Sequence, residues 1–256
     1  MKKNIIITSG PTNERLDAVM KITNMSTGAL GSVVAEEFLN EEDKNINKLY
    51  YLSPKLARKP RIESEKLELI TIESAEDLLK ELKKLLLEKK IDAVVHSAAV
   101  GDYVGEYAIT ARMLASEITE KTYSSRLSKE ELEKYILEII RNPENVVSDE
   151  HKISSYEKDL MFKLSLTPKV IGEIKKTSPE TKLFGFKLLD GVPYEELIDV
   201  ATRLREKNQA DYIIANDLSK IGSGKHPAYF VGEEGVKYTC ETKQEIAKTL
   251  RKIIFK

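Results

Sequence analysis

The chain has 256 residues, of which 41% are hydrophobic and 32% are charged, so it can bury a core and is not an intrinsically disordered chain. Its 41 Lys and Arg residues nearly balance its 42 Asp and Glu residues, and the net charge of -1 excludes a bulk positive field that would recruit nucleic acid or an anionic membrane. The single cysteine, Cys240, can form neither an internal disulfide nor a cysteine-based metal cluster. No apolar run approaches the roughly 18 residues of a membrane span, and the apolar stretch near residue 5 is too short for a signal peptide, so we expect a cytoplasmic protein.

Short β-branched runs alternate with segments of helical period along the chain. The expected strands cover residues 4–8, 49–52, 67–72, 91–97, 183–188 and 211–216. Helices are expected near Ala29, over 74–90 and over 192–208, and Ser74 with Asp77 is typical of an N-terminal capping box. Strands that are apolar throughout are typical of parallel strands covered by helices on both faces. The pattern predicts one α/β domain over residues 1–256, with a Rossmann-like, doubly wound and mainly parallel sheet.

Residues 103–166 depart from this alternation. They contain two helix-like segments, at 109–118 and 129–140, and then the string DLMFKLSL, whose alternation predicts a half-exposed antiparallel strand. A helix with Pro168 at its first position is expected next. We interpret 103–166 as an excursion that serves as a flap or dimerisation arm, although an insertion without function is an equally ordinary alternative.

Four segments are expected at the carboxyl edge of the sheet, where doubly wound proteins bind ligands. They are Ser9–Thr12, Asn24–Gly28, the string SAAVGDY ending at Tyr103, and Ala215–Asp217. Small residues let a ligand approach the backbone, a carboxylate can hold Mg²⁺, and a helix N-terminus attracts phosphate. Each feature also has a structural alternative as a turn or a helix cap, and the sequence lacks both G-x-G-x-x-G and the P-loop pattern.

Six segments, in the same order, resemble motifs of the phosphopantothenate–cysteine ligase family and span residues 4 to about 232. They are TSGPTNERLDAVMKITNMSTGALG, SAAVGDY, HKISS, LTPKVI, FGFKLL and NQADYIIANDLS. No segment resembles the flavin-dependent decarboxylase domain that is fused to this ligase in many bacteria, so we expect the single-function form.

The resemblance implies a ligase of coenzyme A biosynthesis that joins L-cysteine to 4'-phosphopantothenate. A nucleoside triphosphate with Mg²⁺ would convert the pantothenate carboxylate to an acyl nucleotide and release pyrophosphate, and the cysteine amine would then attack the acyl carbon. We expect CTP, as bacterial relatives suggest, and ATP remains open. The resemblance also implies a homodimer, because family members complete the pantothenate pocket across a subunit interface.

By residue matching, the resemblance assigns catalytic roles to Lys152, as the cation at the α-phosphorus, and to Asn24, which would orient the carbonyl. Most members carry an arginine where this chain has Met20, so Lys21 or a residue of a partner chain would hold the substrate. Asp102 is the candidate ligand for Mg²⁺. The nucleotide-binding positions would be Ser9, Gly10, Thr12, Ser26, Ala99, Asp102, Phe186 and Asn216.

Other interpretations of these residues exist. Taken without the resemblance, Lys152 is a solvated lysine and Asn24 a turn residue. His96, inside an apolar strand, is expected to be packed, His151 may be no more than a neighbour of the site, and His226 and Cys240 are expected to be structural. Two rival functions remain: a nicotinamide-dependent oxidoreductase of Rossmann type, for which Ser9–Thr12 is a poor fingerprint, and a non-catalytic nucleotide-binding module.

Overall fold

The computed structural model describes residues 2–40, 45–147 and 153–256, which divide into two compact units. The first, here called the core unit, contains the chain up to Asn13, Thr23–Gly101 and Pro168–Lys256. The second unit contains Glu14–Ile22 and Asp102–Thr167, and so includes the excursion predicted over 103–166. Within the described residues, no helix is long and apolar enough to cross a membrane.

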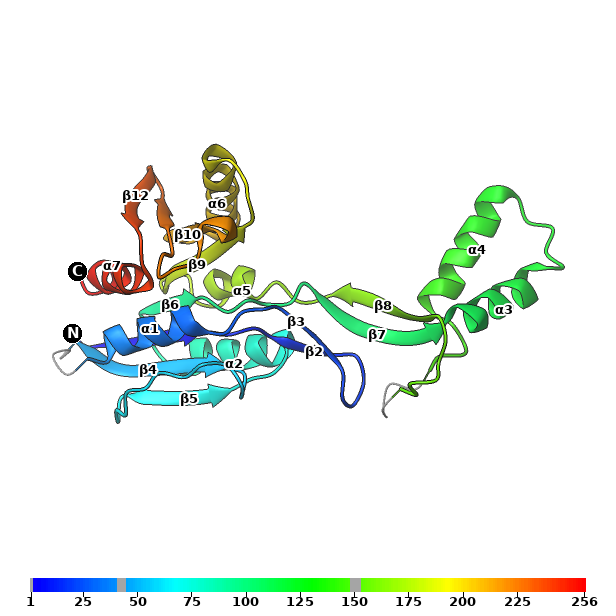
Figure 1. Ribbon diagram of the computed structural model, residues 1–256, viewed down its shortest axis with the longest axis horizontal. Helices are drawn as coiled ribbons and strands as arrows, with labels where there is room; N and C mark the ends of the chain where they lie inside the picture. The colour runs from blue at the N-terminus through cyan, green and yellow to red at the C-terminus, as the bar shows by residue number, and fades with distance from the viewer. Residues whose placement is uncertain (1, 41–44, 148–152) are drawn as a thin grey trace. The chain divides into compact units, whose positions relative to one another are not determined.

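An eight-stranded sheet forms the centre of the core unit (Figure 1). Its spatial order is β12 (Gly235–Cys240), β11 (Ala228–Gly232), β10 (Tyr212–Asp217), β9 (Lys182–Leu189), β6 (Ala93–His96), β1 (Lys3–Thr8), β4 (Ile46–Ser53) and β5 (Leu67–Thr71). The six strands from β10 to β5 pair in parallel, whereas β11 and β12 add an antiparallel edge. The six predicted strands are the six parallel ones, so the predicted Rossmann-like, mainly parallel α/β fold is confirmed.

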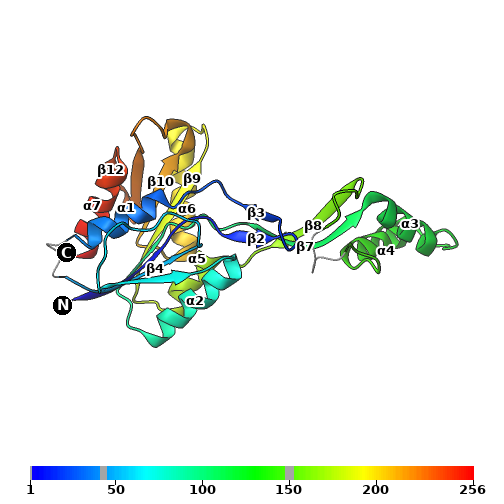
Figure 2. The same ribbon diagram turned by 60° about the horizontal axis from the view of Figure 1, so that its bottom comes forward.

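Helices cover both faces of this sheet (Figure 2). Alternate residues of β1 pack in opposite layers. Ile5 and Ile7 pack in the layer that contains α1 (Ala29–Phe38) and α7 (Lys243–Ile254). Ile6 packs in the layer made by α2 (Ala75–Glu88), α5 (Val170–Thr177) and α6 (Tyr194–Asn208). All three isoleucines are fully buried, which explains why β1 is apolar at successive positions instead of alternating.

The helix boundaries test the local predictions. Ser74 and Asp77 form the predicted capping box of α2. The prediction for Pro168 was wrong, because α5 begins at Val170 and Lys169 is its N-cap, which leaves the proline outside the helix. The chain also forms a short 3₁₀ helix, η1 (Leu218–Lys220), and then β11, β12 and α7, none of which was predicted.

The second unit is built on the antiparallel pair β7 (Tyr103–Thr110) and β8 (Leu160–Leu166) with helices α3 (Ala111–Thr122) and α4 (Lys129–Arg141). The predicted antiparallel strand at 160–166 is therefore confirmed. The helix predicted over 109–118 begins only at Ala111, where the Thr110 side chain caps it, and the preceding strand was missed. A small core of Ile109, Leu114 and Ile139 joins the helices to β7. Two short strands, β2 (Asn13–Arg15) and β3 (Lys21–Thr23), pair with each other.

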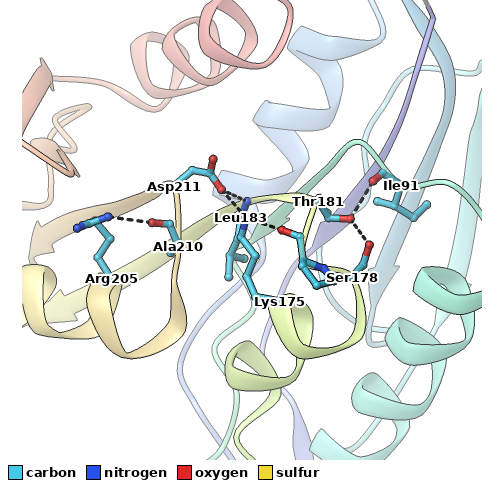
Figure 3. Close-up of polar contacts among 9 residues, drawn as sticks. Ile91, Lys175, Ser178, Thr181, Leu183, Arg205, Ala210 and Asp211 are labelled. Carbon is cyan, nitrogen blue, oxygen red and sulfur yellow. Dashed lines mark hydrogen bonds and ion pairs between the residues drawn. The ribbon is translucent and has the colours of Figure 1, made fainter.

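Polar contacts fix the amino ends of β9 and β10, the end of the sheet remote from the predicted ligand edge (Figure 3). The Asp211 carboxylate accepts a hydrogen bond from the Leu183 amide at 2.8 Å and pairs with the Lys175 ammonium at 3.1 Å. Thr181 donates its hydroxyl to the Ile91 carbonyl at 2.8 Å. Because these groups satisfy one another, this end of the sheet is held by structural contacts.

Candidate active site

The loop after β1 turns at Gly10, which has a positive φ of 79°. A β-carbon at this position would lie 2.5 Å from the β-carbon of Ala57, in the loop after β4, so a larger residue would not fit. The Gly10 carbonyl accepts a hydrogen bond from the Ala99 amide at 2.9 Å. The backbone after β1 is thereby fixed between the loops that follow β4 and β6.

The N-terminus of α1 lies beside this turn and carries no side-chain cap among the described residues. Gly28 is its N-cap, with a φ of 77°, and a β-carbon at Gly28 would lie 3.3 Å from the Cα of Gly10. The Ser26 hydroxyl accepts from the Gly28 amide at 3.4 Å and not from an amide of the first helical turn. Since a helix N-terminus carries partial positive charge and unpaired amides, this arrangement suits a phosphate group.

Gly31, in the first turn of α1, completes what we call the glycine cradle, made of Gly10, Gly28 and Gly31. A β-carbon at Gly31 would lie 2.3 Å from the Ser9 Oγ and 2.5 Å from the Ser9 Cβ. The Ser9 hydroxyl donates to the Gly28 carbonyl at 3.1 Å, so it ties the end of β1 to the helix N-terminus. Gly31 was not among the predicted site residues, although its spacing of three from Gly28 was visible in the sequence.

Asn24 and Thr12 both contact the loop after β6. The Asn24 Nδ2 donates to the carbonyl oxygens of Ala99 at 3.1 Å and Val100 at 3.2 Å. The Thr12 amide also donates to the Ala99 carbonyl, and its hydroxyl accepts from the Gly101 amide at 2.8 Å. The Asn24 side chain is exposed, while Thr12 is fully buried. Six predicted residues of the core unit are thus brought together: Ser9, Gly10, Thr12, Asn24, Ser26 and Ala99.

Phe186 and Asn216 lie on neighbouring strands of the same sheet, β9 and β10. Phe186 is half-buried against the layer that contains α1. Asn216 is 4% exposed, and its Nδ2 donates to the Pro227 carbonyl at 2.8 Å. The amide nitrogen therefore fixes the backbone just before β11. The Oδ1 of Asn216 accepts no hydrogen bond from the described residues.

Three further residues were predicted for the site. Lys21 and Asp102 belong to the second unit. Lys152 and its neighbour His151 lie outside the described residues. The described residues contain no group of three or more His, Cys, Asp or Glu side chains that could hold a metal ion. A Mg²⁺ ion in a nucleotide enzyme is commonly held by one or two carboxylates and the phosphates themselves, so the predicted Mg²⁺ site does not require such a group.

His96, at the end of β6, is packed as predicted. Its Nδ1 lies 2.9 Å from the Thr8 hydroxyl, and burial lowers the pKa of the imidazole to about 4. The ring is therefore neutral near pH 7. Cys240 is also buried, as expected of a structural residue, and its Sγ lies 3.4 Å from the Thr249 hydroxyl.

Comparison with known proteins places this site in a family. The model of the DNA/pantothenate metabolism flavoprotein C-terminal domain matches residues 1–131 and 141–256. The chain belongs to this family. The solved structure of a DNA/pantothenate metabolism flavoprotein from Streptococcus pneumoniae is 33% identical, covers 98% of each chain and superposes with a TM-score of 0.76. The six resembling segments all lie in this matched family domain.

A curated relative is the coenzyme A biosynthesis bifunctional protein CoaBC of Thermococcus kodakarensis, which is 29% identical over 251 residues. The match covers 97% of this chain but 50% of the relative, so the chain spans about half the length of that protein. A solved Cab2 variant in complex with phosphopantothenate-cysteine shares the fold, with a TM-score of 0.67 at 16% identity over 98% of this chain and 86% of the other.

Proposed function

We propose that the chain is a phosphopantothenate–cysteine ligase, which joins L-cysteine to 4'-phosphopantothenate at the expense of a nucleoside triphosphate. The observation that carries this proposal is the glycine cradle beside Asn24. It combines backbone amides that suit phosphate with an exposed polar side chain, and both lie in segments that resemble ligase motifs. The names of the relatives support the same pathway, since they are coenzyme A biosynthesis proteins.

In the first half-reaction, the pantothenate carboxylate attacks the α-phosphorus and pyrophosphate leaves. The cradle amides would hold phosphate, and the Ser9 hydroxyl would keep the cradle in shape through its bond to the Gly28 carbonyl. Phe186 and Asn216 would line the nucleoside pocket. The proposed nucleotide is CTP, accompanied by Mg²⁺, with Asp102 as the proposed carboxylate ligand. Lys152 would neutralise charge at the α-phosphate, a role that rests on the family resemblance alone.

In the second half-reaction, the cysteine amine attacks the acyl carbon. The Nδ2 group of Asn24 already donates to two backbone carbonyls, which leaves Oδ1 as the atom this side chain offers. An oxygen acceptor suits an amine, because the attacking nitrogen carries N–H donors. We therefore propose that Asn24 orients the cysteine amine, whereas the carbonyl-orienting role would require Nδ2 to release one of its carbonyl partners.

The proposed active form is a homodimer formed through the second unit. Tyr103 and Leu166 face each other across the β7–β8 pair and are 51% and 69% exposed, and Leu164 on the same strand face is 40% exposed. Exposed apolar side chains that gather on one sheet face are typical of an interface. A partner chain could then also supply the substrate contact for which Lys21 is the candidate within this chain.

The experiment is a product assay with purified protein. Pyrophosphate release and formation of the amide are measured with triphosphate, phosphopantothenate and cysteine together, and with each omitted in turn. We expect amide formation only with all three, and pyrophosphate release that survives omission of cysteine as a single turnover. Hydride transfer to a nicotinamide would favour the oxidoreductase, and nucleotide binding without any turnover would favour a non-catalytic module.

A further inference from the structure

A cavity of about 340 Å³ lies in the core unit, and segments that are far apart in the chain form its walls. Its walls come from α1, the loop after β4, the turn before β11 and the first turn of α7. The polar side chains in it are Arg58, Lys225, His226 and Lys243, and we call it the basic cavity. None of its residues belongs to the six ligase-like segments except Ala29, the first residue of α1, which follows Gly28 in the string TNMSTGALG.

The cations of this cavity have no carboxylate partner within the described part of the chain. None of the described residues that line it is acidic, and Arg58, Lys225 and Lys243 form no ion pair with any described residue. A cavity of about 430 Å³ at the amino ends of β9 and β10 provides the contrast. There Lys175 pairs with Asp211, as Figure 3 shows, and Lys237 pairs with Glu234. Three cations face three carboxylates in that cavity, whereas the lining of the basic cavity has an excess of positive charge, which predicts an anionic ligand.

Hydrogen bonds between backbone groups fix the main chain at two of the basic residues, Lys225 and His226. Gly222 and Lys225 exchange both amide–carbonyl hydrogen bonds, at 3.2 and 2.8 Å, and close a tight turn. The His226 amide then donates to the Glu241 carbonyl at 2.7 Å, next to the start of α7. Burial and, secondarily, the Lys243 charge lower the pKa of His226 to about 4, so this ring carries no charge near pH 7.

The basic cavity adjoins the glycine cradle. The Arg58 amide donates to the Thr27 carbonyl at 3.0 Å, one residue before the cradle residue Gly28. Ala57, the neighbour of Arg58, is the residue whose side chain leaves no room for a β-carbon at Gly10. The loop after β4 therefore links the basic cavity to the cradle through Ala57 and Arg58.

We propose that the basic cavity holds the two terminal phosphates of the nucleoside triphosphate and then the pyrophosphate that leaves. The inference rests on the proposed ligase function for its place in the reaction. As the bond between the α-phosphorus and the bridging oxygen breaks, the electron pair stays on that oxygen, and negative charge accumulates on the pyrophosphate. Arg58, Lys225 and Lys243 stabilise that charge, while the new bond joins the carboxylate oxygen to the α-phosphorus.

The test is isothermal titration of the full chain with inorganic pyrophosphate, CTP and CMP. The double variant Lys225→Gln/Lys243→Gln removes two of the cations, and Lys248→Gln, an exposed position on α7 outside the cavity, is the matched control. Charge-assisted hydrogen bonds are each worth a factor of roughly ten or more, so the double variant should bind pyrophosphate and CTP at least about tenfold more weakly. CMP affinity should change by less than about twofold, since CMP lacks the terminal phosphates.

Three results would overturn the inference: unchanged pyrophosphate affinity in the double variant, an equal loss in Lys248→Gln, or an equal loss for CMP. Pyrophosphate binding needs no ligase activity, so the two proposals can fail separately. A chain that binds pyrophosphate through these lysines but forms no amide would refute the ligase and keep the anion site. If the chain forms the amide but the double variant binds pyrophosphate normally, the anion site is refuted and the ligase proposal is kept.

Discussion

Replacement of Gly31 by alanine tests whether the glycine cradle is built by close packing. The new β-carbon would lie 2.3 Å from the Ser9 Oγ, 2.5 Å from the Ser9 Cβ and 3.0 Å from the Ser97 Oγ. Ser9 is 1% exposed and its hydroxyl is bonded to Gly28, so it cannot yield without moving the end of β1 or the N-terminus of α1. Gly31→Ala should therefore displace the proposed phosphate site.

Two opposing effects decide the change in stability. Alanine in place of glycine inside a helix stabilises by about 1 kcal/mol. Overpacking a tight interior costs about 1–3 kcal/mol, so the net change should be a loss of up to about 2 kcal/mol. Gly172 is the matched control, because it is also the third residue of its helix, α5. A β-carbon there would meet only the Asn208 Oδ1, at 3.4 Å, so Gly172→Ala should gain about 0.5–1 kcal/mol.

Urea unfolding and triphosphate titration of both variants measure these effects. We expect Gly31→Ala to unfold at lower urea and to bind CTP at least about tenfold more weakly, as loss of charge-assisted contacts implies, while Gly172→Ala binds normally. Adding Ser9→Gly to Gly31→Ala removes both close atoms of Ser9 and should restore part of the stability. The packing argument is wrong if Gly31→Ala is stabilised as much as Gly172→Ala and binds CTP as the unmodified chain does.

Four further changes follow from the structure and the proposed mechanism. Burial lowers the pKa of His96 to about 4, whereas the same side chain in the unfolded chain binds a proton near pH 6.5. The free energy of unfolding should therefore fall as the pH falls from 6.5 to 4, by up to about 1.4 kcal/mol per pH unit. In urea unfolding, the stability of His96→Gln should depend less steeply on pH. Asn24→Ala should slow amide formation about 100-fold and pyrophosphate release less; near-normal ligation would remove Asn24 from the mechanism. Lys152→Gln should keep the fold but slow single-turnover pyrophosphate release. A normal rate would show that Lys152 is an ordinary solvated lysine without a catalytic role. Leu166→Lys should shift light scattering from dimer toward monomer, and an active monomeric parent chain would refute the dimer.

The parallel sheet could be predicted from the sequence because burial on both faces requires successive apolar residues within each strand. β1 and β6 contain the uninterrupted apolar runs Ile5–Ile7 and Ala93–Val95, and that pattern requires no knowledge of their partners. The edge strand β12 was missed because its residues are mostly only partly buried, although its neighbour β11 is mostly buried. The strand at 103–110 was missed because its buried residues lie only at its end, next to the helix that Thr110 caps.

The candidate site was predictable to the extent that it lies in continuous motifs. Ser9, Gly10, Asn24 and Ser26 stand in one string of the sequence, and the structure brings them together through contacts with the loops after β4 and β6. The alternative in which Ser26 caps the helix was wrong, since Gly28 occupies the N-cap position itself. Sequence letters cannot distinguish a serine that caps from one that precedes a glycine N-cap, because the difference lies in the backbone angle at residue 28.

The basic cavity was beyond sequence reasoning for a different reason. The near-neutral net charge argues against a general attraction for phosphates, yet charge balance over a whole chain says nothing about its local distribution. Arg58, Lys225 and Lys243 come from a loop, a turn and a helix start that only the folded core unit brings together, and the acidic residues that balance them lie elsewhere. A neutral chain can hold a highly charged ligand when its cations are left without acidic neighbours. Three cations also line the cavity at the other end of the sheet, but three carboxylates line it as well and pair with both of its lysines, so the local charge balance and not the count of cations decides which cavity suits phosphate.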